Sequence, residues 1–374
     1  MCVIAGYSGN RRAAPILIEM MKKIEYYDGG YGIGIATIHE GKLYYARALG
    51  DTEMLTRTTD ALDLPGNTGV IHIRPAFSTH LAIVQPFLDA DNKMALFENG
   101  TARATNTNEF YADMRGMMDE FLDRGIIAPS AEHLSPSNFP KQITKDGRAF
   151  FYVEAYPLLI GDTVKSLAAD MSMKAAMSYS VKKAHERFPT DNITVSVHSE
   201  LPNTVTIGTV SRPMSVLEAD GETFIASAAT AFPEDIVGKV THLPQCSVSQ
   251  ITPDGLEIIY DSLEGVRVEQ VTPRIRAIYR ETVEKLLSGR KDSPLSLYEM
   301  KMGEHLPPNT WSEPMIDCRY ALPQGQLKPS MPAFYQTLYD LHKEGRLHSK
   351  LGIVYAKDVN WPKHDAYFTK FWLE

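Results

Sequence analysis

Cysteine is scarce in this chain, with only Cys2, Cys246 and Cys318 among 374 residues. Three thiols are too few for the disulfide framework of a small secreted domain. No Cys-x-x-Cys pair occurs, and no two of the 11 histidines lie three or four residues apart. Because zinc and iron sites usually need such local pairs, we expect no metal and no other cofactor.

Long apolar runs and excess positive charge are also missing. No stretch of about 18 apolar residues is present, so we expect no membrane-spanning helix. The first residues lack a basic region followed by an apolar segment, which predicts no secretory signal and a cytoplasmic location. The formal net charge of −8 gives no general attraction to nucleic acid or anionic lipid, so neither is an expected partner.

The length and patterning predict an α+β protein with a small appendage. Many short strands alternate with two blocks of helices, which predicts two packed sheets with helices outside them. We assign residues 1–270 to this main domain. Residues 271–374, with helices expected at 273–288 and 332–344, are assigned to a small C-terminal α/β extension of unknown role.

Two other patterns lead to specific expectations. A single long helix is expected at 163–187, and its predicted apolar face comprises Leu167, Met171, Ala175 and Tyr179. The glycines of Gly30-x-Gly32-x-Gly34 resemble a dinucleotide-binding loop. They follow a helix and lead into a strand, which is the wrong context for that loop, so no nucleotide role is expected.

Cys2 is the strongest candidate for a catalytic residue. Removal of Met1 would place a free α-amine and a thiol on the same residue. The thiol is a nucleophile, and the amine can accept its proton directly or through one water. Their ordinary pKa values, about 8.5 and about 7.7–8.0, are close enough for this transfer near neutral pH.

Several segments resemble class II glutamine amidotransferases, a family of N-terminal-nucleophile hydrolases. Met-Cys-Val-Ile-Ala-Gly at residues 1–6 is similar to the family's Met-Cys-Gly-Ile-x-Gly opening. Residues 24–36, His72-Ile73-Arg74, Phe97-Glu98-Asn99-Gly100 and 223–227 resemble further family segments in the same order. The similarity is closest to the glutaminase domain of glucosamine phosphate synthase and to stand-alone glutaminase subunits.

The resemblance implies a four-layer αββα sandwich and a set of roles. The side-chain amide of Asn99 and the backbone N–H of Gly100 would stabilise the tetrahedral oxyanion. Arg74 would hold the α-carboxylate of glutamine, and the neighbouring Pro75, Ala76 and Phe77 would line the substrate site. Glu132 would take the place of the acidic residue that binds the α-ammonium group.

Some positions depart from the family pattern. Asp28-Gly29 stands where the family has Arg-Gly, and Gln85-Pro86-Phe87 stands where it has His-Pro-His. The leading hypothesis is a glutaminase whose ammonia passes to an acceptor, such as a synthase subunit, that is not recognisable in this chain. An amide hydrolase for another substrate and a catalytically inactive ligand-sensing module remain alternatives. Formation of a homo-oligomer is left open.

Overall fold

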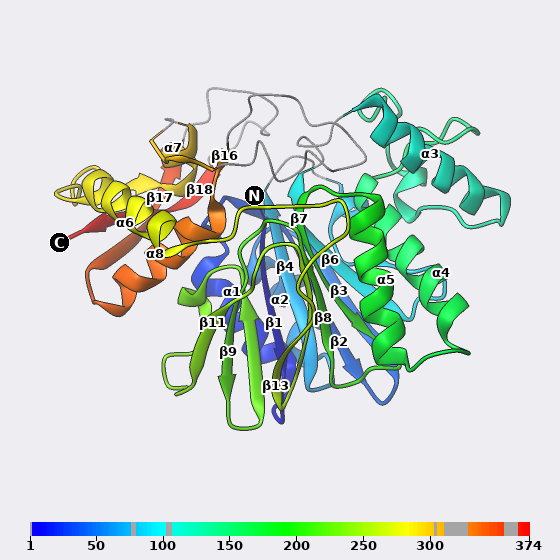
Figure 1. The fold of residues 1–374 in the computed structure, drawn as a ribbon, viewed down its shortest axis with the longest axis horizontal. Helices are drawn as coiled ribbons and strands as arrows, with labels where there is room; N and C mark the ends of the chain where they lie inside the picture. Colours follow the sequence, from blue (N-terminus) through cyan, green and yellow to red (C-terminus); the bar gives the residue numbers. More distant parts are fainter. Residues whose placement is uncertain (1, 76–79, 102–106, 303–304, 310–327, 355–365) are drawn as a thin grey trace.

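The computed structural model describes residues 2–75, 80–101, 107–302, 305–309, 328–354 and 366–374. Its centre consists of two antiparallel sheets, with helices on both outer sides (Figure 1). The N-terminus lies at the upper edge of the sheets, between the C-terminal region on the left and α3–α5 on the right (Figure 1).

The first sheet has seven strands in the order β11-β9-β10-β1-β4-β2-β3. These strands are β1 (Val3–Ser8), β2 (Gly30–His39), β3 (Lys42–Leu49), β4 (Thr68–Pro75), β9 (Ser215–Ala219), β10 (Glu222–Ala226) and β11 (Lys239–His242). A hairpin joins β2 to β3, and both residues of its turn have positive φ, 47° at Glu40 and 72° at Gly41. This backbone twist matches that of a two-residue antiparallel hairpin.

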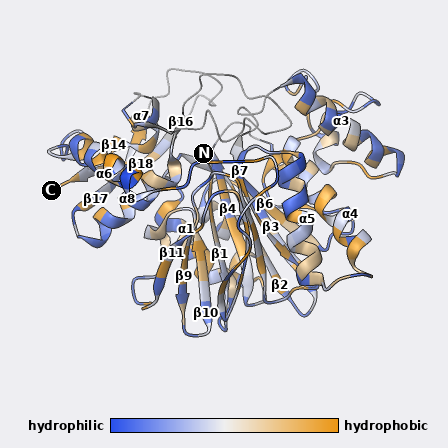
Figure 2. Cartoon of the chain, viewed as in Figure 1, coloured by the Kyte–Doolittle hydropathy of each residue, from blue (hydrophilic) through white to orange (hydrophobic). Residues whose placement is uncertain are grey.

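The second sheet has six strands in the order β13-β12-β8-β7-β6-β5. They are β5 (Phe87–Leu88), β6 (Met94–Thr101), β7 (Asp191–His198), β8 (Val205–Thr209), β12 (Ser247–Thr252) and β13 (Gly255–Tyr260). Ile4 and Val70 of the first sheet pack against Phe97 and Val195 of the second in a common apolar layer. Figure 2 shows this concentration of apolar residues along the central strands.

Each sheet is covered by helices on its outer face. On the first sheet lie α1 (Ala13–Ile24) and α2 (Thr52–Thr58); on the second lie α3 (Asn108–Asp123), α4 (Ala155–Leu167) and α5 (Met173–Arg187). The short helical turns are η1 (Ala61–Asp63), η2 (Leu81–Ile83), η4 (Pro129–Glu132), η5 (Tyr152–Glu154) and η6 (Ala229–Ala231). This arrangement confirms the predicted four-layer αββα sandwich.

The C-terminal region packs directly on the first layer. It contains α6 (Pro273–Leu287), β14 (Leu295–Ser296), α7 (Leu297–Met302), α8 (Met331–Lys343), β17 (Leu347–Val354) and β18 (Ala366–Leu373), together with the two-residue strands β15 (Pro308–Asn309) and β16 (Lys328–Pro329). Phe334 and Phe371 share one apolar core with Leu17 and Met21 of α1. Whether residues 271–374 form a separate domain stays a prediction.

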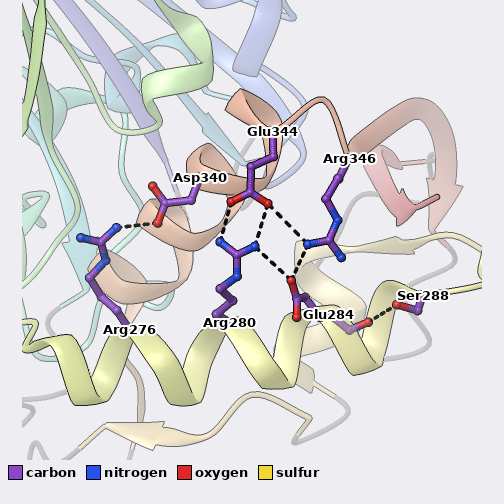
Figure 3. A network of polar contacts seen from close by, with 7 residues as sticks. All are labelled: Arg276, Arg280, Glu284, Ser288, Asp340, Glu344 and Arg346. Carbon is purple, nitrogen blue, oxygen red and sulfur yellow. Dashed lines mark hydrogen bonds and ion pairs between the residues drawn. The ribbon is translucent and has the colours of Figure 1, made fainter.

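A polar network joins α6 to the end of α8 and the start of β17 (Figure 3). Arg280 places both terminal nitrogens 2.7 Å from the carboxylate of Glu344. Arg346 donates to Glu284 at 2.6 Å, and Arg276 donates to Asp340 at 2.5 Å. These pairs are partly exposed, so each adds little stability by itself, but together they fix the orientation of α8 against α6.

The expectation of one helix at 163–187 is wrong. Two helices occupy this region, α4 and α5, and residues 168–172 separate them. Ser172 begins α5 because its hydroxyl accepts a hydrogen bond from the Ala175 N–H at 3.3 Å, as an N-cap does. The break changes the helical phase, so Met171 is exposed and the buried face of α5 instead includes Met177 and Val181.

None of the helices in the described part of the chain has the length and apolar character needed to cross a bilayer.

Candidate active site

Cys2 and Asn99 meet where the two sheets end. Side chains alternate along a strand, and Ile4 of β1 points between the sheets, so Cys2 lies on the same face. In β6, Phe97 points between the sheets, which places Asn99 there too. The backbone N–H of Cys2 donates a hydrogen bond to Oδ1 of Asn99 at 3.2 Å.

Arg74 reaches the same place from the neighbouring strand β4. Val3 pairs with Ile73, so the next register position places Arg74 opposite Cys2. The guanidinium is buried; it donates to the carbonyl oxygen of Ile83 at 2.6 Å and lies 5.5 Å from the centroid of the Phe151 ring. Burial lowers the pKa of Arg74, whereas Cys2 acts to raise it.

The glycine-rich stretch of β2 leaves space for this arginine. A Cβ at Gly32 would lie 3.0 Å from Cγ of Arg74, and one at Gly34 would lie 1.9 Å from the carbonyl oxygen of Gln85. The glycines thus allow the Arg74 side chain and the segment after η2 to approach the strand closely.

The thiol of Cys2 lies in an environment that disfavours its anion. The pKa of this thiol is raised to about 11; burial is the largest cause and the carboxyl of Glu98 acts in the same direction, whereas Arg74 acts to lower it. At neutral pH the thiol therefore keeps its proton until a base removes it. This requirement fits an α-amine on the same residue.

Glu98, next to Asn99, is a buried acid. Burial raises its pKa to about 8, and the hydroxyl of Tyr152 donates to its Oε1 at 3.2 Å. Its backbone is held by the side chain of Gln85, whose Nε2 donates to the Glu98 carbonyl at 3.0 Å and whose Oε1 accepts from the Glu98 N–H at 2.5 Å. Gln85 therefore fixes the strand that carries Asn99.

Gly100 follows in the same strand, where a side chain does not fit. A Cβ built there would lie 2.3 Å from Cβ of Asn192 and 2.4 Å from Oε1 of Glu98. The φ of Gly100 lies outside the left-handed region, so its backbone conformation does not demand glycine. Close packing is what requires glycine at this position of the Asn-Gly pair.

The remaining predicted residues are placed to different degrees. Pro75 is buried at the end of β4, and Ala76 and Phe77 lie outside the described residues. Glu132 is exposed at the end of η4. The ring of His133, its neighbour, stacks on His80 at 4.8 Å, which brings η4 beside the segment that follows Arg74. The substrate-binding roles of these four residues stay predictions.

The structure also adds two residues from the C-terminal region that the sequence analysis did not single out. Lys301 of α7 forms a buried ion pair with Asp28, and the phenol of Tyr335 in α8 is buried where Asp28 and Cys2 both act on its pKa. The sequence feature that indicates this ion pair is Asp28, an acid at a position where the resemblance predicts an arginine.

Comparisons with known proteins support this reading of the geometry. No family model matches the chain. Glutamine–fructose-6-phosphate aminotransferase (isomerizing) of Thermosynechococcus vestitus is 28% identical over 280 residues, which cover 73% of this chain and 38% of that protein. The enzyme of the same name from Synechocystis sp. is 28% identical over 291 residues, covering 76% of this chain and 40% of that protein.

Among solved structures, glutamine phosphoribosylpyrophosphate amidotransferase from B. subtilis superposes with a TM-score of 0.52 at 16% identity, covering 76% of this chain and 58% of that one. The chain is a homologue of the class II glutamine amidotransferases. The chain spans less than half the length of the aminotransferases it matches.

Proposed function

We propose that this chain hydrolyses the side-chain amide of glutamine, with Cys2 as the nucleophile once Met1 is removed. The observation that carries the proposal is the hydrogen bond from the Cys2 nitrogen to Oδ1 of Asn99 at 3.2 Å. That bond occupies the amide oxygen of Asn99 and leaves its Nδ2 free to donate to an oxyanion that forms at the sulfur.

The reaction follows from these groups. The α-amine of Cys2 takes the thiol proton, and the thiolate attacks the amide carbon to form a tetrahedral oxyanion. The C–N bond then breaks, and the ammonium returns a proton to the leaving nitrogen, which departs as ammonia. Water attacks the remaining thioester, which releases glutamate and restores the thiol.

Substrate recognition is assigned to cation–anion contacts. Arg74 offers a planar donor fork to the α-carboxylate, Glu132 accepts the α-ammonium group, and Pro75, Ala76 and Phe77 line the pocket. Support for Arg74 comes from its burial and its position opposite Cys2 in the strand register.

We further propose that the ammonia passes to an acceptor subunit outside these 374 residues. Support comes from the named relatives, which are aminotransferases, and of which this chain spans 38–40%. The cytoplasmic location and self-association stay predictions.

Intact-mass measurement tests the proposal. The purified protein should lack Met1, and a glutamine analogue that carries an electrophilic diazoketone should add once, at Cys2. A Cys2→Ala variant should lose both the adduct and ammonia release. The matched control is Cys246→Ala, which removes a second, buried thiol and should keep both.

Each other outcome has a definite meaning. Retention of Met1 would contradict catalysis by Cys2. Labelling by iodoacetamide without labelling by the analogue would indicate a different amide substrate. A Cys2→Ala variant with full biological activity would indicate a ligand-sensing module.

A further inference from the structure

A buried ion pair links the beginning of the chain to its C-terminal region. Nζ of Lys301 lies 3.0 and 2.9 Å from the two carboxylate oxygens of Asp28, across 273 positions of sequence. The side chains are 18% and 2% exposed. Burial alone would raise the pKa of Asp28, but the Lys301 ammonium acts against it and the net pKa is lowered, so the carboxylate stays ionised.

Asp28 lies at the same end of the first sheet as the nucleophile: Gly30, two residues after it, pairs with Pro75 of β4, and the neighbouring Arg74 lies opposite Cys2 in the strand register. The Asp28 carboxylate is among the groups that raise the pKa of the Cys2 thiol, after burial and Glu98. Burial is the main cause that raises the pKa of the Tyr335 phenol, and the charges of Asp28 and Cys2 raise this pKa as well. The C-terminal helices α7 and α8 therefore bring Lys301 and Tyr335 next to the Cys2 site.

The neighbouring charges set the context of this pair. Arg212 and Asp191 form a second buried ion pair, with Nη2 and Oδ2 2.7 Å apart, and both act on the pKa of Lys301, which burial lowers. The other titratable groups near Cys2 come from separate elements: Arg74 in β4, Glu98 in β6, Tyr152 in η5 and Tyr335 in α8.

The chemistry of an N-terminal nucleophile gives such a carboxylate a use. When the α-amine accepts the thiol proton, a neutral pair becomes a thiolate and an ammonium. In a buried site, that ammonium needs an anion nearby. Asp28 supplies one, and among the groups that lower its pKa and keep it ionised, the Lys301 ammonium has the largest effect.

We propose that Lys301 is a positioning residue for the nucleophile: it holds the ionised Asp28 carboxylate where this group stabilises the α-ammonium of mature Cys2. The C-terminal region is thereby part of the catalytic unit. This inference rests on the proposed function in taking Cys2 as the nucleophile, but it does not depend on glutamine being the substrate.

The test is the pH dependence of Cys2 reactivity in the full chain without Met1. The double variant Asp28→Asn/Lys301→Met removes both charges and leaves neither buried alone, which usually preserves folding. The rate of Cys2 alkylation by iodoacetamide, followed by intact mass, should rise at a pH about one unit lower than in the parent protein, because the anion that stabilises the ammonium is gone. The value of kcat/KM for glutamine should fall about tenfold.

Matched variants separate positioning from general stability. Lys301→Arg keeps the pair and should keep the parent pH profile. Lys370→Met removes a cation of β18 whose partner, Glu299 of α7, lies 3.3 Å away on the same helix as Lys301; it should lower the melting temperature without moving the profile. Asp28→Glu retains both charges, displaces the carboxylate by one methylene and should move the profile.

Unchanged alkylation profiles in both the double variant and Asp28→Glu would overturn the inference, as would an equal shift in Lys370→Met. Failure of the proposed function looks different: the parent protein would release no ammonia from glutamine, while the alkylation profiles would still differ between parent and variants.

Discussion

The side-chain oxygen of Asn99 accepts a hydrogen bond from the nitrogen of Cys2 at 3.2 Å, across 97 positions of sequence. The two residues belong to different sheets, so the contact exists only when the sandwich is closed. Because this bond occupies Oδ1 of Asn99, its Nδ2 is the polar atom that remains to donate to a further acceptor.

Asn99→Ala should lower kcat about 10²–10³-fold, the usual cost of removing one oxyanion donor. The value of KM should change little, because the ground-state amide is bound elsewhere. Steady-state ammonia release measures both constants. Asn99→Asp, which keeps the shape but removes the donor, should be equally slow; activity near that of the parent protein in either variant would contradict the oxyanion role.

Arg74→Lys should raise KM for glutamine about tenfold or more, because a lysine cannot make the two parallel contacts of a guanidinium with a carboxylate. The matched control is Arg47→Lys. Arg47 lies on β3, two strands away from β4, and it donates to the carbonyl oxygen of Val84, the residue after the Ile83 that accepts from Arg74. Initial-rate kinetics should show an unchanged KM in this control. A similar rise in both variants would mean that the loop, not carboxylate binding, is disturbed.

Gly100→Ala should destabilise the protein by about 1–3 kcal/mol and reduce activity, because the new Cβ would lie 2.3 Å from Cβ of Asn192. Gly116→Ala is the matched control: no atom lies within 4 Å of a Cβ there, and the residue is inside α3, where alanine stabilises by about 0.5–1 kcal/mol. Thermal melting distinguishes the two. Equal melting temperatures would show that β6 adjusts freely.

Glu98→Gln should make the protein less sensitive to alkaline pH. The pKa of Glu98 is about 8 in the fold against an ordinary 4.5. Between these values the unfolded chain loses its proton and the native state keeps it, so stability falls as pH rises. Glutamine does not titrate and still accepts from Tyr152. Denaturant unfolding should show similar stabilities at pH 4 and a gain on the order of 1–3 kcal/mol for the variant at pH 8.

The same substitution at the exposed Glu109 serves as a control for the loss of one negative charge. It should not reproduce the gain seen in Glu98→Gln. Parallel stability curves for the parent protein and Glu98→Gln across this pH range would show that the buried carboxyl does not control the effect.

The strands that carry Cys2, Arg74 and Asn99 could be predicted from sequence, because short apolar runs mark β1, β4 and β6. The catalytic and binding roles of these residues stay predictions. The Gly30-x-Gly32-x-Gly34 pattern lies at the start of β2. The glycines of this pattern leave space for Arg74 and for the segment at Gln85. This role could not be predicted from the pattern, because Arg74 lies on the neighbouring strand β4.

The errors arise where one local interaction or one distant contact decides the structure. The hydroxyl of Ser172 caps α5 and splits the expected long helix. Strand β18 is absent from the sequence-based expectations, because its pairing with β17 and its packing on α1 are long-range. Lys301 was missed for the same reason, since its partner lies 273 positions away.

The packing of β18 against the beginning of the chain determines when the site is completed during synthesis. The N–H of Thr369 donates to the carbonyl of Tyr26 at 2.8 Å, and Phe368 covers Gly29. A ribosome adds about 5–20 residues per second, so residue 2 waits tens of seconds before residues 366–373 arrive. During that interval Tyr26 and Gly29 lack the strand that covers them in the finished fold. The cover on this end of the first sheet is thus added last, long after the strands beneath it have been made.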